Sequence, residues 1–168
     1  YDGPRRSSIA IARTLFVTGL LHAYGFKRSN RSKALPWALL GFNLVPAAVM
    51  VGVMALTKMD PPLGYADYSL QMQVLSSIFA AAQAPVLFSR DLRHGSIVLY
   101  LARPLSAGML AVTRWLSLEC AIAIFLLAPV LLLFIGSLLA GHDAATHAQQ
   151  AGKAALAVLL LAALLASI

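Results

Sequence analysis

Charged residues are scarce in this chain, and acidic residues are the scarcest of them. Aspartate and glutamate together number 6 of 168 residues, and charged residues of both signs reach only 11%. Ordinary soluble domains carry about 25% charged residues. Hydrophobic residues make up 60% of the chain, and the mean hydropathy is +0.81. This composition excludes an ordinary water-soluble domain and predicts helices that face lipid.

Cysteine and the common catalytic and metal-binding motifs are also missing or rare. The single Cys120 excludes an intrachain disulfide and lies in an apolar run, where it is a small apolar residue. The chain contains no G-x-x-x-x-G-K-[ST] phosphate loop and no H-E-x-x-H metal motif. His142 and His147 are five residues apart, a weak metal signal that ordinary loop histidines also give. We expect no catalytic residue, cofactor or metal on this chain, and no enzyme activity of its own.

Basic residues exceed acidic ones and give a net charge of +7, but they do not gather on one soluble module. Seven of the 13 lysines and arginines precede residue 34, and four lie between Arg90 and Arg114. Lys58 and Lys153 each stand alone in their loops. The positive-inside rule therefore places the N-terminus and the 90–114 region on the cytoplasmic side of the plasma membrane. Nucleic acid is not an expected partner.

Long apolar runs predict an all-α, polytopic helical membrane protein with a single transmembrane domain. Residues 35–57, 68–88 and 108–140 are each long enough for a crossing of about 20 residues, and residues 151–168 begin a fourth. Pro46 predicts a kink in the first span, and the start of the 108–140 run is expected to protrude from the bilayer. Residues 141–150 are predicted to be a polar loop. Because the last run is unbroken at Ile168, we expect the sequence to be a fragment truncated at its C-terminus.

Residues 1–34 are predicted to form a cytoplasmic lead and one mostly apolar helix. Arg13 interrupts this helix, and Thr14, Thr18 and His22 recur every four residues as a narrow polar stripe. As a spanning helix it would divide the surrounding cations between the two sides of the membrane. As an amphipathic helix lying on the cytoplasmic face it keeps them together, and we favour this interface helix.

The predicted spans contain few polar residues, and each has two interpretations. Asn43, Gln73 and Gln83 are either interhelical hydrogen-bond partners or part of a transport pathway. Glu119 is the one acidic residue in a span, and it is either an interfacial glutamate or a proton or cation site. In the second span small and polar residues share one face, which is predicted to pack against other helices: Gln73, Ser76, Ser77, Ala80, Gln83 and Ala84.

Residues 89–107 separate the second and third spans and combine charge with an apolar run. The ionisable residues are Arg90, Asp91, Arg93, His94 and Arg103, which place the segment outside the hydrocarbon. Ile97–Leu101 nevertheless supplies five consecutive apolar residues, more than a loop that only sets topology needs. Ser106, after Arg103-Pro104, is a predicted cap of the third span. The pattern predicts an ordered loop that docks on a partner.

The run LFSRDLRHGSIVLYLARPLS resembles the first cytoplasmic loop of ABC-2 type transporter permeases. The matching residues are Arg90, Asp91, Arg93, Gly95, Ser96, Arg103, Pro104, Leu105 and Ser106. The order of an interface helix, a span, a short external loop, a second span and this loop is also similar. Ala107-Gly108 departs from the family, since many relatives have a basic or aromatic residue there.

This resemblance implies the permease subunit of an ATP-driven exporter. A separate ABC ATPase subunit would bind ATP and Mg, and a second permease copy or homologue would complete the transporter in the lipid bilayer. Ser96–Leu101 would be the coupling helix, with Ile97 and Leu99 on the apolar side seated in a groove of the ATPase. Arg90, Arg93 and Arg103 would orient it through charge pairs.

The alternative is a membrane protein outside this family, either an ion-coupled secondary transporter or a subunit of a multi-span assembly. Such a transporter needs ionisable groups or broken helices near the middle of the bilayer. Glu119 and the prolines Pro46 and Pro129 are the residues that favour it. A membrane-embedded enzyme lacks any supporting cluster of catalytic residue types.

Overall fold

The computed structural model describes residues 7–26, 30–87, 106–141 and 143–167. These residues form helices and contain no strand, which confirms the all-α prediction. The helices are α1 (Ser8–Ala23), α2 (Asn30–Thr57), α3 (Tyr65–Gln71), α4 (Gln73–Leu87), α7 (Ala107–Leu139) and α8 (Ala144–Ser167).

Three helices are long and apolar enough to cross a membrane, which makes this a helical membrane protein by length and composition. They are Ser32–Thr57 within α2, the whole of α7 and the whole of α8. Helices α3 and α4 meet the same criterion together, with a bend of 55° between them, as in a broken span or a re-entrant loop. Helix α1 has 16 residues and is shorter than the roughly 20 that a crossing needs.

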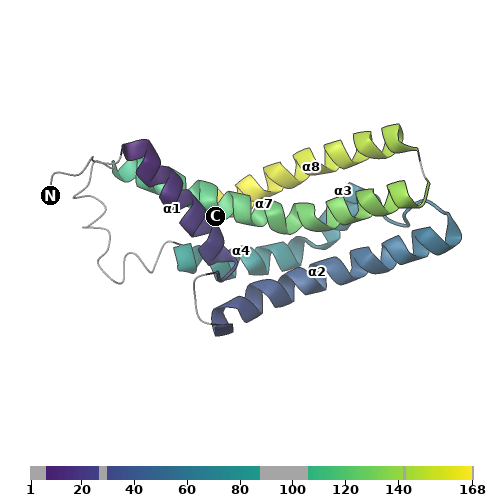
Figure 1. The fold of residues 1–168 in the computed structure, drawn as a ribbon, viewed down its shortest axis with the longest axis horizontal. Coiled ribbons are helices and arrows are strands. Elements are labelled where there is room, and N and C mark those ends of the chain that lie inside the picture. Colours follow the sequence, from purple (N-terminus) through teal and green to yellow (C-terminus); the bar gives the residue numbers. More distant parts are fainter. Residues whose placement is uncertain (1–6, 27–29, 88–105, 142, 168) are drawn as a thin grey trace.

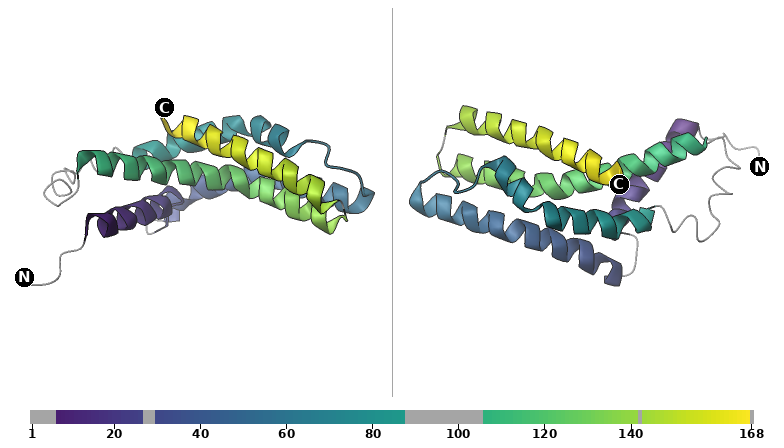
Figure 2. Two further views of the ribbon diagram at one scale, coloured as in Figure 1. Left: turned by 90° about the horizontal axis from the view of Figure 1, so that it is seen from above. Right: turned by 180° about the vertical axis from the view of Figure 1, so that it is seen from behind.

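Helix α7 is the centre of the bundle and contacts each of the other five helices described. Figure 1 shows α2, α4, α7 and α8 lying along one another, while α1 crosses α7 at one end. We call this the near end; α4 ends there and α7 begins there. At the opposite, far end, residues 58–64 connect α2 to α3 and residues 140–143 connect α7 to α8 (Figure 2).

The second span differs from its prediction as one helix over residues 68–88. The helix begins earlier, at Tyr65, and breaks at Met72. Tyr65 and Tyr68 are almost fully buried, and their hydroxyl groups bond to α7, α8 and α2. These bonds set the direction of the short helix α3, and the bend lets α4 pack on α7 from a different angle. The predicted second span is therefore two helices with a break at Met72.

The polar face predicted for this span is only partly buried. Ser76, Ala80 and Gln83 are buried, whereas Gln73 is exposed and Ser77 is half-buried. The face therefore packs against neighbours through Ser76, Ala80 and Gln83.

The predicted polar loop over residues 141–150 is also wrong, because α8 begins at Ala144. Asp143 precedes the first turn, and its carboxylate accepts hydrogen bonds from the Thr146 hydroxyl at 2.6 Å and the Thr146 N–H at 3.1 Å. These two bonds lower the pKa of Asp143, the hydroxyl contributing most. An aspartate three residues before a threonine is a helix-start signal that outweighs the polarity of the following turns.

Pro46 and Pro129 lie inside their helices and do not end them. α2 runs without interruption past Pro46, and α7 runs without interruption past Pro129. Each proline lacks the N–H that would bond to the carbonyl four residues earlier, so each leaves one carbonyl free for another partner.

Candidate functional site

The predicted ATPase-coupling residues lie outside the described part of the chain. They are Arg90, Asp91, Arg93, His94, Gly95, Ser96, Ile97, Leu99, Arg103 and Pro104. The two flanking helices are described, and α7 starts as predicted: the Ser106 hydroxyl accepts a hydrogen bond from the Met109 N–H at 3.2 Å and caps α7. The helices next to this segment are therefore the place to look for a functional site.

Helix α1 packs very closely against the first half of α7. Gly19 is buried, and a Cβ atom at this position would lie 2.8 Å from Ser117 Oγ and 3.5 Å from a guanidinium nitrogen of Arg114. The Ser117 hydroxyl points to the Phe16 carbonyl of α1 at 3.2 Å as well as to the Thr113 carbonyl of its own helix at 2.8 Å. Only a residue without a side chain permits this approach.

A second contact fixes the end of α1. The Tyr24 hydroxyl donates a hydrogen bond to the Ala121 carbonyl of α7 at 2.8 Å. Burial raises the pKa of Tyr24, so the hydroxyl keeps its proton and stays a donor. The Tyr24 ring lies 5.7 Å from Phe79 of α4, and Phe79 stacks on Phe125 of α7 at 4.7 Å. We call Phe16, Gly19 and Tyr24 of α1, with Ser117 and Ala121 of α7, the α1–α7 joint.

The joint lies in the first half of α7, a helix longer than one bilayer crossing. α7 has 33 residues, which at 1.5 Å per residue gives about 50 Å, against a hydrocarbon thickness of about 30 Å. Arg114, only 8% exposed, lies in the same region of α7. The joint therefore fastens the short helix α1 to the first half of α7, the helix that follows residues 88–105.

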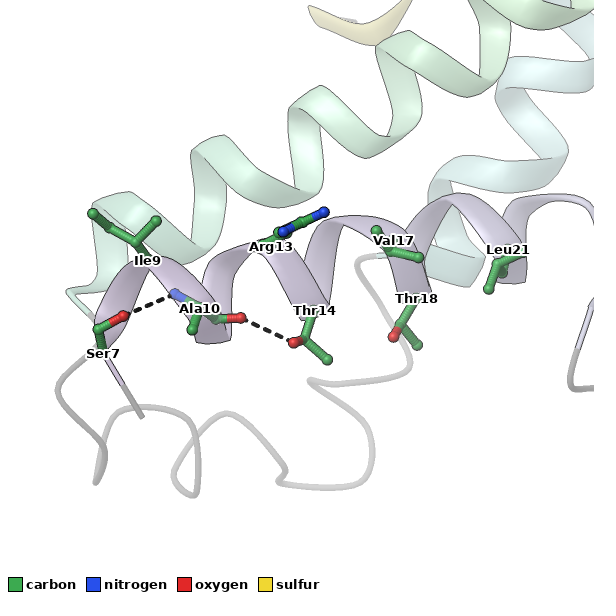
Figure 3. A pocket seen from close by; sticks show the side chains of 8 residues that line it. All are labelled: Ser7, Ile9, Ala10, Arg13, Thr14, Val17, Thr18 and Leu21. Carbon is green, nitrogen blue, oxygen red and sulfur yellow. Dashed lines mark hydrogen bonds between the residues drawn. The ribbon is translucent and has the colours of Figure 1, made fainter. Parts of the chain in front are cut away.

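The opposite face of α1 lines a groove of about 710 Å³ (Figure 3). Its described lining residues belong to α1 and to its N-cap, Ser7: Ser7, Ile9, Ala10, Arg13, Thr14, Val17, Thr18 and Leu21. Arg13 is exposed, and the Thr14 hydroxyl bonds to the Ala10 carbonyl of its own helix at 2.9 Å. His22, the third member of the predicted polar stripe, is half-buried. This face combines one cation with apolar and hydroxyl side chains.

Asn43 joins three helices in the interior. Its Nδ2 donates to the Phe125 carbonyl of α7 at 2.9 Å, and its main-chain carbonyl accepts a hydrogen bond from the Tyr68 hydroxyl of α3. The Phe125 carbonyl is the one that Pro129, four residues later, leaves without an intrahelical donor. Asn43 Oδ1 is buried and has no hydrogen-bond partner among the described residues. These contacts give Asn43 the first of its two predicted roles, hydrogen bonding between helices.

Replacing Asn43 with leucine is expected to destabilise the protein by about 1 kcal/mol, the usual scale of interhelical hydrogen bonds in membranes. In a Pro129→Ala background the main-chain N–H gained at position 129 would serve the Phe125 carbonyl, so the same replacement should cost clearly less. Thermal unfolding of the four variants in detergent measures this coupling. Equal costs in both backgrounds would contradict the assignment.

The other polar residues predicted in the spans do not gather around one point. Gln83 is only 3% exposed on α4, Gln73 is exposed on the same helix, and Glu119 is half-buried on α7. Sequence reasoning did not identify Gly19, Tyr24, Tyr65 or Tyr68. Their partners are hydroxyl groups, main-chain carbonyls and one histidine on other helices, and no local pattern reveals such partners.

Comparison with known proteins adds no family to these observations: no family model, no curated protein and no solved structure matches the chain. The contacts of the described residues and the sequence pattern therefore carry the functional argument.

Proposed function

We propose that this chain is the membrane-spanning permease subunit of an ATP-driven exporter of the ABC-2 type, coupled to a separate ATPase through residues 89–107. The observation that carries the proposal is the α1–α7 joint. A helix too short to cross a bilayer is fixed to the first half of α7, the helix that directly follows this segment. A displacement of the segment would therefore move α7 and α1 together, and through Phe79 it would also reach α4.

The charge distribution supports a cytoplasmic position for the near end. Eleven of the 13 lysines and arginines lie before residue 34 or between Arg90 and Arg114. An ATPase works in the cytoplasm, so a coupling segment has to lie there, with the N-terminus beside it. Since the sequence has no phosphate loop, the partner would supply the ATP and Mg site.

Residues 89–107 would act as a rigid connection between the ATPase and α7. Ile97 and Leu99 would anchor it in an apolar groove of the ATPase, and Arg90, Arg93 and Arg103 would orient it. A second permease copy or homologue would face the first across the transport path. Outward apolar surfaces on α2 and α8, for example at Phe42, Val49 and Leu160, leave room for both lipid and such a partner.

An ion-coupled secondary transporter is the second candidate, and one observation favours it. α3 and α4 meet at a bend of 55°, and Tyr68 of α3 bonds to the main-chain carbonyl of Asn43, whose Oδ1 is buried without a partner among the described residues. Broken helices beside buried polar groups are typical of ion-coupled sites. The described surroundings of Asn43 contain no carboxylate bonded to it, which makes this the weaker candidate.

Purification from native membranes in mild detergent separates the two candidates. The permease should retain a nucleotide-binding subunit, and the purified complex should hydrolyse ATP. Isolation of the chain without such a subunit, together with transport that a proton gradient drives in ATP-free vesicles, would support the secondary transporter instead.

A further inference from the structure

One outward surface of α3 and α4 carries an exposed glutamine among apolar side chains. Its described residues line a shallow groove of about 520 Å³: Leu70, Gln73, Val74, Ser77, Ile78 and Ala81. Leu70, Val74 and Ile78 are 60%, 68% and 48% exposed, and Gln73 is exposed as well. Since one groove includes residues of both helices, the six form one continuous face across the break at Met72, which we call the α3–α4 surface.

The glutamine lies within the membrane-spanning length of the bundle. Tyr65, earlier in the chain, bonds to Ser137 of α7, and Phe79, later in the chain, stacks on Phe125 of α7. Gln73 is therefore level with the part of α7 between these two contacts, inside a helix long enough to cross a membrane. An amide at this depth faces hydrocarbon unless something covers it, and it is costly there without a hydrogen-bond partner.

The Gln73 side-chain amide has no hydrogen-bond partner among the described residues, whereas its neighbour Ser77 has one. The Ser77 hydroxyl donates to the Gln73 main-chain carbonyl at 2.8 Å, so its hydrogen is already used. The amide of Gln73 offers two N–H donors and one carbonyl acceptor to its surroundings. Whatever covers this surface should therefore both donate and accept a hydrogen bond at this point, which a lipid acyl chain cannot do.

A second copy of this chain meets that requirement without any further residue. In a twofold-symmetric dimer the same surface of each copy faces its counterpart. Two glutamines that meet across the axis can each donate to the other and accept from it, and such amide bonds between helices favour their association in membranes. The small residues Ser77 and Ala81 on the same face allow the two helices to approach closely.

We propose that two copies of this chain associate through the α3–α4 surface, with their Gln73 side chains hydrogen-bonded to each other across a twofold axis. The proposal rests on the proposed function for its second permease copy, and it adds the surface that this copy occupies. The apolar side chains of Leu70, Val74 and Ile78 would leave lipid and pack around the glutamine pair.

Disulfide crosslinking in native membranes tests the contact, in a Cys120→Ala background that removes the single native cysteine. Gln73→Cys should form a crosslinked dimer on oxidation, because residues at a twofold axis meet their own counterparts within the reach of a disulfide. Leu160→Cys, at a 73% exposed position on α8, is the matched control and should stay monomeric on a denaturing gel.

Energy transfer between labelled copies, measured as the dimer is diluted in detergent, gives a second reading. Gln73→Leu should weaken the dimer about tenfold, which corresponds to a loss of about 1.4 kcal/mol of hydrogen bonding between helices. Gln71→Leu changes an exposed glutamine at the end of α3 that is not part of the surface, and it should associate like wild type. Both glutamines are exposed in the single chain, so neither replacement should change its thermal unfolding.

Three results would overturn the proposal: Gln73→Cys crosslinks no more than Leu160→Cys, it crosslinks only to a different protein, or both leucine variants dimerise like wild type. A Gln73→Cys dimer in a preparation that retains no ATPase would support this contact and contradict the proposed function. A retained ATPase without the Gln73→Cys crosslink would overturn this contact alone.

Discussion

Replacing Gly136 with alanine is expected to lower the stability of the protein by about 3 kcal/mol, the upper range for overpacking in a packed interior. A Cβ atom at this position would lie within 3.0 Å of all three side-chain carbons of Val51 on α2. Valine is stiff at χ1 and has no alternative position to adopt cheaply. α2 and α7 would therefore have to separate. Thermal unfolding in detergent should show a midpoint about 9 °C below wild type.

Val51→Ala supplies the specific rescue for Gly136→Ala. It removes both methyl groups that the new side chain would meet, so the double variant should regain most of the lost stability. Gly52→Ala is the matched control, because a Cβ atom at that helical position meets nothing within 4 Å. A Gly136→Ala protein as stable as the Gly52→Ala protein would contradict the close α2–α7 packing.

Gly19→Leu is expected to cost about 2 kcal/mol and to detach α1 from α7. The new side chain would occupy the space of Ser117 Oγ and Cβ, at 2.8 and 3.0 Å from the added Cβ, and would break the hydrogen bond from Ser117 to Phe16. The unfolding midpoint should fall by about 6 °C. Proteolysis should also cleave the chain faster around residues 24–30, because α1 would no longer be held.

The control for this variant is Gly52→Leu, which adds the same side chain to a helical glycine on an exposed face. The gain in helix propensity is the same in both variants, so their difference isolates the packing of the joint. Unchanged proteolysis of the Gly19→Leu protein would show that α1 does not depend on this contact.

The sequence was sufficient to predict the elements that depend on length and hydrophobicity. α2 and α7 occupy the predicted apolar runs, because about 20 apolar residues have few alternatives to a buried or lipid-facing helix. The break at Met72 was not predictable, since it follows from bonds that Tyr65 and Tyr68 make with helices distant in sequence. The early start of α8 was predictable in principle from Asp143 and Thr146, but the polar composition of residues 144–150 concealed it.

The candidate site divides in a similar way. Asn43 was predictable as an interior residue, because a single amide side chain in an apolar helix is expected to be buried with a hydrogen-bond partner on another helix. The role of Gly19 does not follow from the sequence, because a glycine in a helix carries no signal of close packing until the helix that packs on it is known. The coupling residues 89–107 remain a prediction from sequence, and the structure supplies only the helices beside them.

Retention of the ATPase subunit by the Ile97→Asp variant is the measurement that tests the central claim most directly. A carboxylate in the apolar groove of a partner should weaken the complex about thirtyfold, equivalent to the loss of one hot-spot contact of about 2 kcal/mol. Met59→Asp makes the same kind of change at a 70% exposed position at the far end and should leave the complex intact. The account predicts that the ATPase co-purifies with wild type and Met59→Asp but not with Ile97→Asp. Equal recovery with all three proteins would contradict it.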